Sequence, residues 1–266
     1  MLVKLLNYEF KAMGRILLPF YGALILLGLI SSIYTRFIPD DITLLNLSGI
    51  ILIMLFVFMI IFATALSFIM TILRFKRNLL DNEGYIMNTL PVTPWQNISA
   101  KLITAIVFQI LAAISMALAI IAFILPMPDV SLSNFITGFA ELYNNLKQFN
   151  INFGILYIET ILLGIVGLIS INLSLYSAMC IGHSFNSHKV LISILIYILF
   201  YMINQFVQGS ILIILSATHI GPIYDYSSYS HIMELWLLIY IIYRAVFAAV
   251  YGFLVHYFMK NKLNLQ

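Results

Sequence analysis

The chain has 266 residues, of which 63% are hydrophobic and only 9% are charged. Soluble domains carry about 25% charged residues, so this composition excludes a soluble globular protein and predicts one that crosses a membrane several times. The net charge of +3 does not indicate nucleic-acid binding, because the basic residues are spread over short loops and form no basic stripe. The single cysteine, Cys180, excludes an intramolecular disulfide framework.

The first fifteen residues have the pattern of a helix that lies in the membrane interface. Apolar side chains recur there at helical spacing, at Leu2, Leu6, Phe10 and Met13, and charged residues occupy the other faces. A signal peptide is the alternative, but basic residues continue to Arg15 and no small-residue cleavage site follows the next apolar run. We therefore predict an N-terminal interfacial helix over residues 1–15.

Six apolar segments follow, and each reaches the roughly 20 residues that cross the hydrocarbon core. They cover residues 16–35, 43–73, 98–125, 153–181, 190–216 and 232–259. No repeat, low-complexity segment or soluble domain interrupts them. The sequence predicts an all-α polytopic membrane protein with six transmembrane helices in a single membrane domain over residues 1–266.

The distribution of Lys and Arg predicts the orientation of the spans, because cytoplasmic loops are enriched in these residues. With the N-terminus inside, only Arg36 and Lys147 fall outside, and Arg244 falls within a span. The ten cytoplasmic residues are Lys4, Lys11, Arg15, Arg74, Lys76, Arg77, Lys101, Lys189, Lys260 and Lys262. An odd number of spans would mix the two sets, so we predict that both termini are cytoplasmic.

Residues 74–101 interrupt the apolar pattern with charged and turn-forming residues. Since spans flank this stretch on both sides and its beginning is basic, it is predicted to be a water-exposed cytoplasmic loop that a soluble partner grips. Trp95, near its end, fits an anchor at the membrane interface.

A second amphipathic helix is predicted on the outer side. After the third span, apolar residues recur with helical periodicity from Leu132 to Phe149, and polar residues lie among them. Such a helix rests on the membrane or caps the bundle.

Motifs that would give the chain chemistry of its own are missing. It has no Gly-Lys dipeptide for a P-loop, no HExxH or paired cysteines for zinc, and no GxSxG or GxGD sequence. Its five histidines are scattered over both faces. We expect no catalytic residue, no metal site and no cofactor bound by this chain.

Two ionisable residues fall inside predicted spans, Glu159 in the fourth and Arg244 in the sixth. A charge at mid-bilayer costs a few kcal/mol even on insertion scales, so each needs a partner, a cavity or water. A polar site along a translocation path and a structural role, as an interhelical ion pair or a snorkelling arginine, are equally compatible with this pattern.

The fourth span also carries a ridge of small residues. It consists of Ser170, Ser174, Ala178 and Gly182, four residues apart. Small residues let helices approach closely, so the ridge predicts packing within the chain or, alternatively, a dimer seam.

Three short stretches carry a resemblance to a known family. Residues 4–15 (KLLNYEFKAMGR), residues 81–92 (DNEGYIMNTLPV) and the inner turn 182–186 (GHSFN) resemble the permease subunits of ABC-2-type transporters of Gram-positive bacteria. The likeness extends over nearly the whole chain in topology. It implies an N-terminal elbow helix and a cytoplasmic coupling helix between spans two and three. The residues implied to contact an ATPase are Leu80, Asp81, Asn82, Glu83, Gly84, Tyr85, Ile86, Met87 and Asn88.

The resemblance implies an exporter subunit in the bacterial cell membrane. Separate ATPase subunits would bind ATP and Mg²⁺, and a second permease, the same or related, would complete the membrane part among the lipids. The cargo would be amphipathic or hydrophobic: a peptide, a drug or a lipid. A secondary transporter or channel without an ATPase is the alternative, although no inverted repeat is clear. A membrane scaffold that senses peptides is a third possibility.

Overall fold

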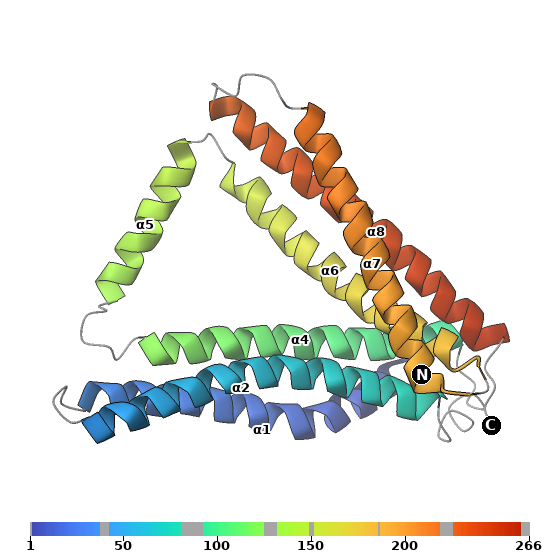
Figure 1. Cartoon of the computed structure of the whole chain (residues 1–266), viewed down its shortest axis with the longest axis horizontal. Helices are drawn as coiled ribbons and strands as arrows, with labels where there is room; N and C mark the ends of the chain where they lie inside the picture. Colours follow the sequence, from blue (N-terminus) through green and yellow to red (C-terminus); the bar gives the residue numbers. More distant parts are fainter. Residues whose placement is uncertain are drawn as a thin grey trace. The chain divides into compact units, whose positions relative to one another are not determined.

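The chain is helical throughout the part that a computed structural model describes, which comprises residues 2–37, 43–80, 93–124, 132–148, 152–185, 187–218 and 226–261. In chain order, the elements are α1 (Leu2–Phe37), α2 (Thr43–Phe75), the π-helical turn η1 (Lys76–Leu80), α4 (Pro94–Ile124), α5 (Leu132–Gln148), α6 (Phe153–Gly182), α7 (Lys189–Thr218) and α8 (Tyr226–Asn261). Figure 1 labels the α-helices.

Six of these helices are long and apolar enough to cross a membrane: α1, α2, α4, α6, α7 and α8. Each has at least 30 residues, which at about 1.5 Å per residue exceeds a hydrocarbon core of about 30 Å. The chain is therefore a multi-pass membrane protein, as its composition predicts. The amphipathic helix predicted after the third span is present as α5, Leu132–Gln148.

Helix α1 runs without interruption through the boundary predicted between Arg15 and Ile16. Gly14 does not break it, and Pro19 lies in its interior, where it can give the carbonyl of Arg15 no hydrogen bond. Residues 2–15 therefore form no element separate from the first span. Their place at the membrane interface stays a prediction.

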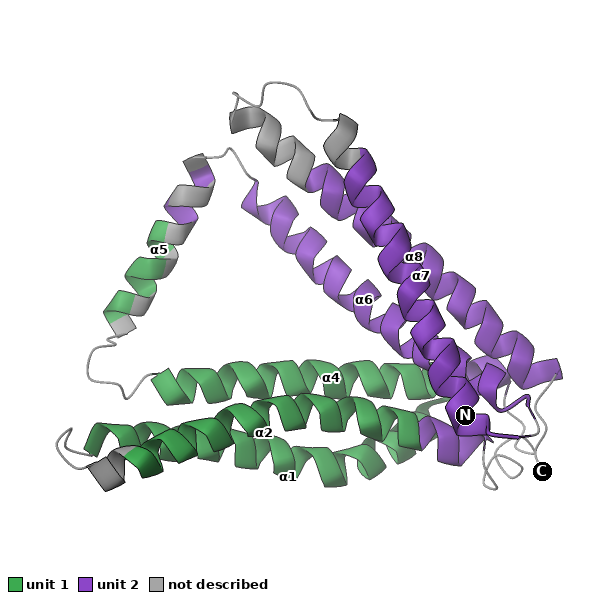
Figure 2. Cartoon of the chain, viewed as in Figure 1, with its two compact units in different colours: residues 1–73, 99–142 green, residues 74–98, 143–266 purple. Residues whose placement is uncertain are grey.

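The chain divides into two compact units, which Figure 2 colours green and purple. Unit 1 comprises Met1–Leu73 and Ser99–Leu142, and unit 2 comprises Arg74–Ile98 and Tyr143–Gln266. The single membrane domain over residues 1–266 stays a prediction.

Unit 1 is held together where α1, α2 and α4 meet. One core cluster consists of Met13, Leu17, Tyr21, Phe108 and Ala112, and a second consists of Leu24, Phe56, Ala63 and Ala119. The hydroxyl of Tyr21 lies 2.8 Å from Ser67 Oγ of α2 and 3.0 Å from the carbonyl of Phe108 in α4. One buried side chain thus fixes the register of three helices.

Helices α1 and α4 run in the same direction at close range. Glu9 contacts Lys101 near the beginning of both helices, and Gly28 meets Ala119 further along. A Cβ on Gly28 would lie 2.6 Å from the carbonyl oxygen of Ala119, so only glycine permits this separation. This shared direction is expected, because α2 crosses the membrane in the opposite direction between α1 and α4.

Unit 2 is centred on α6, which packs against both α7 and α8. Close to its end, Gly182 faces the backbone of Ser193 in α7. The predicted ridge on α6 lies inside the unit, since Ser170, Ser174, Ala178 and Gly182 are all buried, as is the neighbouring Cys180. The prediction of packing within the chain is confirmed for this ridge.

Candidate functional site

The π-helical turn η1 attaches the beginning of segment 81–92 to unit 2. Phe75, the last residue of α2, is fully buried, and its ring stacks on that of Tyr176 in α6 with the centroids 4.0 Å apart and the planes 9° apart. Leu79 and Leu80 of η1 are buried as well. A π-helical turn is rare and is found frequently at functional sites. The end of α2 is therefore a candidate functional region of this chain.

The first turn of α4, which follows residues 81–92 in the chain, packs against α8. Trp95, in the first turn of α4, stacks on the ring of His256 at 4.8 Å between centroids and 12° between planes. A Cβ on Gly252 would lie 3.8 Å from the indole of Trp95, in ordinary contact. Trp95 remains about half exposed (49%), which suits the interfacial role predicted for it.

The coupling helix predicted over residues 80–88 lies outside the described residues, except for Leu80. Leu80 is buried, with 6% exposure, and its contact with an ATPase stays a prediction. The prediction that residues 74–101 form one exposed loop is wrong at both ends. Residues 74–80 and 94–101 are helical. Among them, the apolar side chains of Phe75, Leu79, Leu80 and Ile98 are buried.

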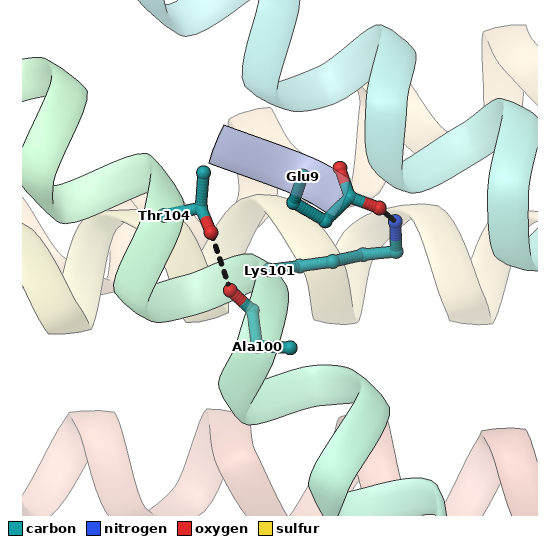
Figure 3. A network of polar contacts seen from close by, with 4 residues as sticks. All are labelled: Glu9, Ala100, Lys101 and Thr104. Atoms are coloured by element: carbon teal, nitrogen blue, oxygen red, sulfur yellow. Dashed lines mark hydrogen bonds and ion pairs between the residues drawn. The ribbon is translucent and has the colours of Figure 1, made fainter. Parts of the chain in front are cut away.

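A buried ion pair joins α1 to α4 within unit 1 (Figure 3). Lys101 Nζ donates to Glu9 Oε1 at 2.7 Å, and the two side chains are only 4% and 3% exposed. Nearby, Thr104 Oγ1 donates to the carbonyl of Ala100 at 2.8 Å. The sequence predicts Glu9 away from the apolar face of an interfacial helix and Lys101 at the end of an exposed loop, whereas the structure buries both side chains.

Glu159 lies in α6 within unit 2 and is buried, with 8% exposure. Its Oε2 atom has no hydrogen-bond partner among the described residues. No ion pair joins it to Arg244 in the described part of the chain. Of the two explanations that the sequence leaves open, the interhelical ion pair between these residues is therefore not formed.

Arg244 of α8 is held by aromatic side chains of its own helix. Its guanidinium lies over the rings of Tyr240 and Tyr243, 5.2 and 5.9 Å from their centroids. Nη2 donates to the hydroxyl of Tyr240 at 2.8 Å, whereas Nε is buried without a partner. Cation–π attraction at this range helps to hold a charge away from water.

Asn204 connects α7 to α8 beside this arginine. Tyr243 donates its hydroxyl hydrogen to Asn204 Oδ1 at 2.6 Å, and Asn204 Nδ2 donates to the hydroxyl of Tyr251 at 2.6 Å. Asn204 Nδ2 also reaches the carbonyl of Phe200 at 2.8 Å. Both tyrosines are thereby fixed, which positions the ring on which Arg244 rests.

An aromatic stripe runs along α8, and sequence reasoning did not single it out. Neighbouring rings are 4.8 to 5.8 Å apart along its length. The members are Trp236, Tyr240, Tyr243, Phe247 and Tyr251. Their spacing of four or three residues was visible in the sequence, and it places them on one face of a helix.

Comparison with known proteins identifies no relative: no family model matches the chain, and neither a curated protein nor a solved structure is detectably similar. Within the described ranges, no three His, Cys, Asp or Glu side chains come together as a metal site would require.

Proposed function

We propose that this chain is the membrane-spanning subunit of an exporter driven by separate ATPase subunits. The observation that supports this proposal is the attachment of segment 81–92 to unit 2 at both flanks, through Phe75 on Tyr176 and Trp95 on His256. If a soluble partner displaced this segment, the displacement would be transmitted to α6 and α8 through the stacked rings at its two ends. A flexible connection would transmit much less of it. Helix shifts of this kind are a common way to propagate a conformational change.

The resemblance to ABC-2-type permeases supplies the remaining parts of the proposal. Two ATPase subunits bind ATP and Mg²⁺, and a second permease, identical or related, completes the membrane part. The assembly resides in the cell membrane of a bacterium and moves an amphipathic or hydrophobic cargo outward. The apolar surfaces of the six long helices suit a peptide, a drug or a lipid.

Co-purification tests the proposal. The proposal predicts that a gene for an ATPase adjoins the gene of this chain. The chain is tagged and co-expressed with that ATPase, and the ATPase retained on the tag is measured. Wild type retains it, whereas the double reversal Asp81→Lys with Glu83→Lys loses it. The matched control is Glu141→Lys, which reverses one exposed charge on α5 and retains the ATPase. If the wild-type chain never retains an ATPase and the double reversal exports normally, the proposal fails.

A second variant tests the transmission step itself. Trp95→Ala removes the stack on His256, so the ATPase still binds and hydrolyses ATP while export in proteoliposomes falls. Trp95→Phe keeps an aromatic ring and retains most of the export. Normal export by Trp95→Ala would show that this contact transmits nothing.

A secondary transporter is the second candidate, and Glu159 is the observation that favours it. A buried carboxylate with an unpartnered oxygen resembles the proton- or ion-binding groups of such proteins. This candidate predicts ion-coupled transport by the chain alone in vesicles without ATP, abolished by Glu159→Gln.

A further inference from the structure

Arg244 carries a positive charge that no described residue neutralises. Its interactions are one hydrogen bond to the Tyr240 hydroxyl and two aromatic faces. Glu159, the acidic residue buried in α6 of the same unit, forms no ion pair with it. Since arginine stays protonated in proteins, the charge itself remains.

The position of Arg244 makes this charge costly. It lies in the span Glu234–Asn261, about 15 Å from the first end and about 25 Å from the other at roughly 1.5 Å per residue. A hydrocarbon core of about 30 Å centred on this span would have Arg244 about 9 Å below its surface. The guanidinium lies over the rings of Tyr240 and Tyr243 and bonds to the Tyr240 hydroxyl, one turn toward the nearer end of the span.

Most N–H groups of the Arg244 guanidinium have no hydrogen-bond acceptor among the described residues. Of its five N–H groups, the described residues engage only one at Nη2, and Nε is buried without a partner. The Tyr240 hydroxyl accepts that bond, which leaves its own hydrogen for another acceptor. The neighbouring Tyr243 hydroxyl gives its hydrogen to Asn204, and no described acidic side chain forms an ion pair with the guanidinium.

We propose that Arg244 and Tyr240 bind the anionic head group, a phosphate or carboxylate, of an amphiphile. The planar guanidinium fork matches both oxyanions, and the anion would neutralise the buried charge. Trp236 and Phe247, half-buried on the aromatic stripe on either side, offer apolar surface to an alkyl chain. The head group comes either from a bilayer lipid or from the cargo, and its assignment to cargo rests on the proposed export function.

The test measures binding of dodecyl phosphate to the full-length chain in phosphatidylcholine nanodiscs, with no ATPase present. Wild type binds it, and Arg244→Gln binds roughly 10- to 100-fold more weakly, the loss of one or two charge-assisted hydrogen bonds. Tyr240→Phe keeps the ring and weakens binding several-fold. Dodecyl trimethylammonium, with the same chain and the opposite charge, does not bind the site.

Arg36→Gln is the matched control, because it removes the same charge from an exposed position and leaves the affinity unchanged. Equal affinity in Arg244→Gln and wild type overturns the proposal, and so does an equal loss in Arg36→Gln. Thermal unfolding separates a structural role: Arg244→Gln unfolds at the same or a higher temperature, because an uncompensated charge is gone. A lower unfolding temperature with unchanged binding assigns Arg244 to structure alone and overturns the site.

Phosphatidylglycerol incorporated into the nanodiscs distinguishes the two sources. If it displaces dodecyl phosphate from wild type and not from Arg244→Gln, a bilayer lipid occupies the site; if it does not compete, the site selects a cargo. Both results support the anion site. Since the assay contains no ATPase, failure of the exporter proposal in co-purification leaves this result unaffected, and the reverse also holds.

Discussion

Glutamate and lysine side chains lose their hydration when they are buried, and the mutual contact of Glu9 and Lys101 at 2.7 Å offsets part of that loss. Replacing such a pair by apolar residues is often neutral, whereas removing one partner leaves an uncompensated charge. The pair therefore acts less as a source of stability than as a constraint on how α1 and α4 align.

Single and double substitutions separate these effects. Glu9→Met or Lys101→Met alone should lower the free energy of unfolding by about 3–5 kcal/mol, and the double variant should regain most of it. Thermal unfolding of the purified chain in detergent measures this. Lys11→Met, which removes an exposed lysine from the same helix, should change stability little. Additive losses in the double variant would show that the two charges do not depend on one another.

The partnership of Glu9 with Lys101 lay beyond sequence reasoning for a physical reason. The residues are 92 positions apart, and a pattern along one helix cannot say which neighbour covers a given face. Glu159 and Arg244 show the same limit: their presence inside spans could be predicted, but not that one would be buried without a partner and the other held by tyrosines.

At the scale of elements, apolar length predicts the structure well. All six spans appear as long helices, because a continuous apolar run must satisfy its backbone internally within lipid. The boundary predicted at residue 15 rested on a change in polarity, and α1 continues through it, with Gly14 packed against Phe108. Likewise α8 begins at Tyr226 instead of residue 232, since aromatic and polar residues can extend a helix beyond the apolar core.

The close approach of α6 to α7 depends on Gly182. A Cβ there would lie 2.7 Å from the backbone nitrogen and 2.8 Å from the Cα of Ser193, and backbone cannot move aside as a side chain can. Gly182→Ala should therefore force α6 and α7 apart and destabilise the protein by about 1–3 kcal/mol. Gly167→Ala, on the same helix with nothing within 4 Å, should be neutral or stabilise by up to about 1 kcal/mol. Similar unfolding temperatures for the two variants would contradict the packing at Gly182.

For the whole molecule, the direction in which the chain crosses the membrane follows from its basic residues. Lys147 and Lys260 are both exposed, and the enrichment of cytoplasmic loops in Lys and Arg predicts that they lie on opposite sides. A membrane-impermeant maleimide applied to intact cells should label Lys147→Cys and not Lys260→Cys, and permeabilised cells should show both. Wild type serves as the blank. Labelling of Lys260→Cys in intact cells would reverse the assignment of the C-terminus.

The burial of Cys180 makes the native sequence a reporter of its own unfolding. It is the chain's only cysteine, and its side chain is 2% exposed near the end of α6, so a thiol reagent can reach it only when unit 2 opens. The rate at which the unmodified protein becomes alkylated as temperature rises should thus follow the opening of α6 from its neighbours. Ligands that bind the α6–α8 bundle should slow that alkylation, which offers a way to screen for cargo without a transport assay.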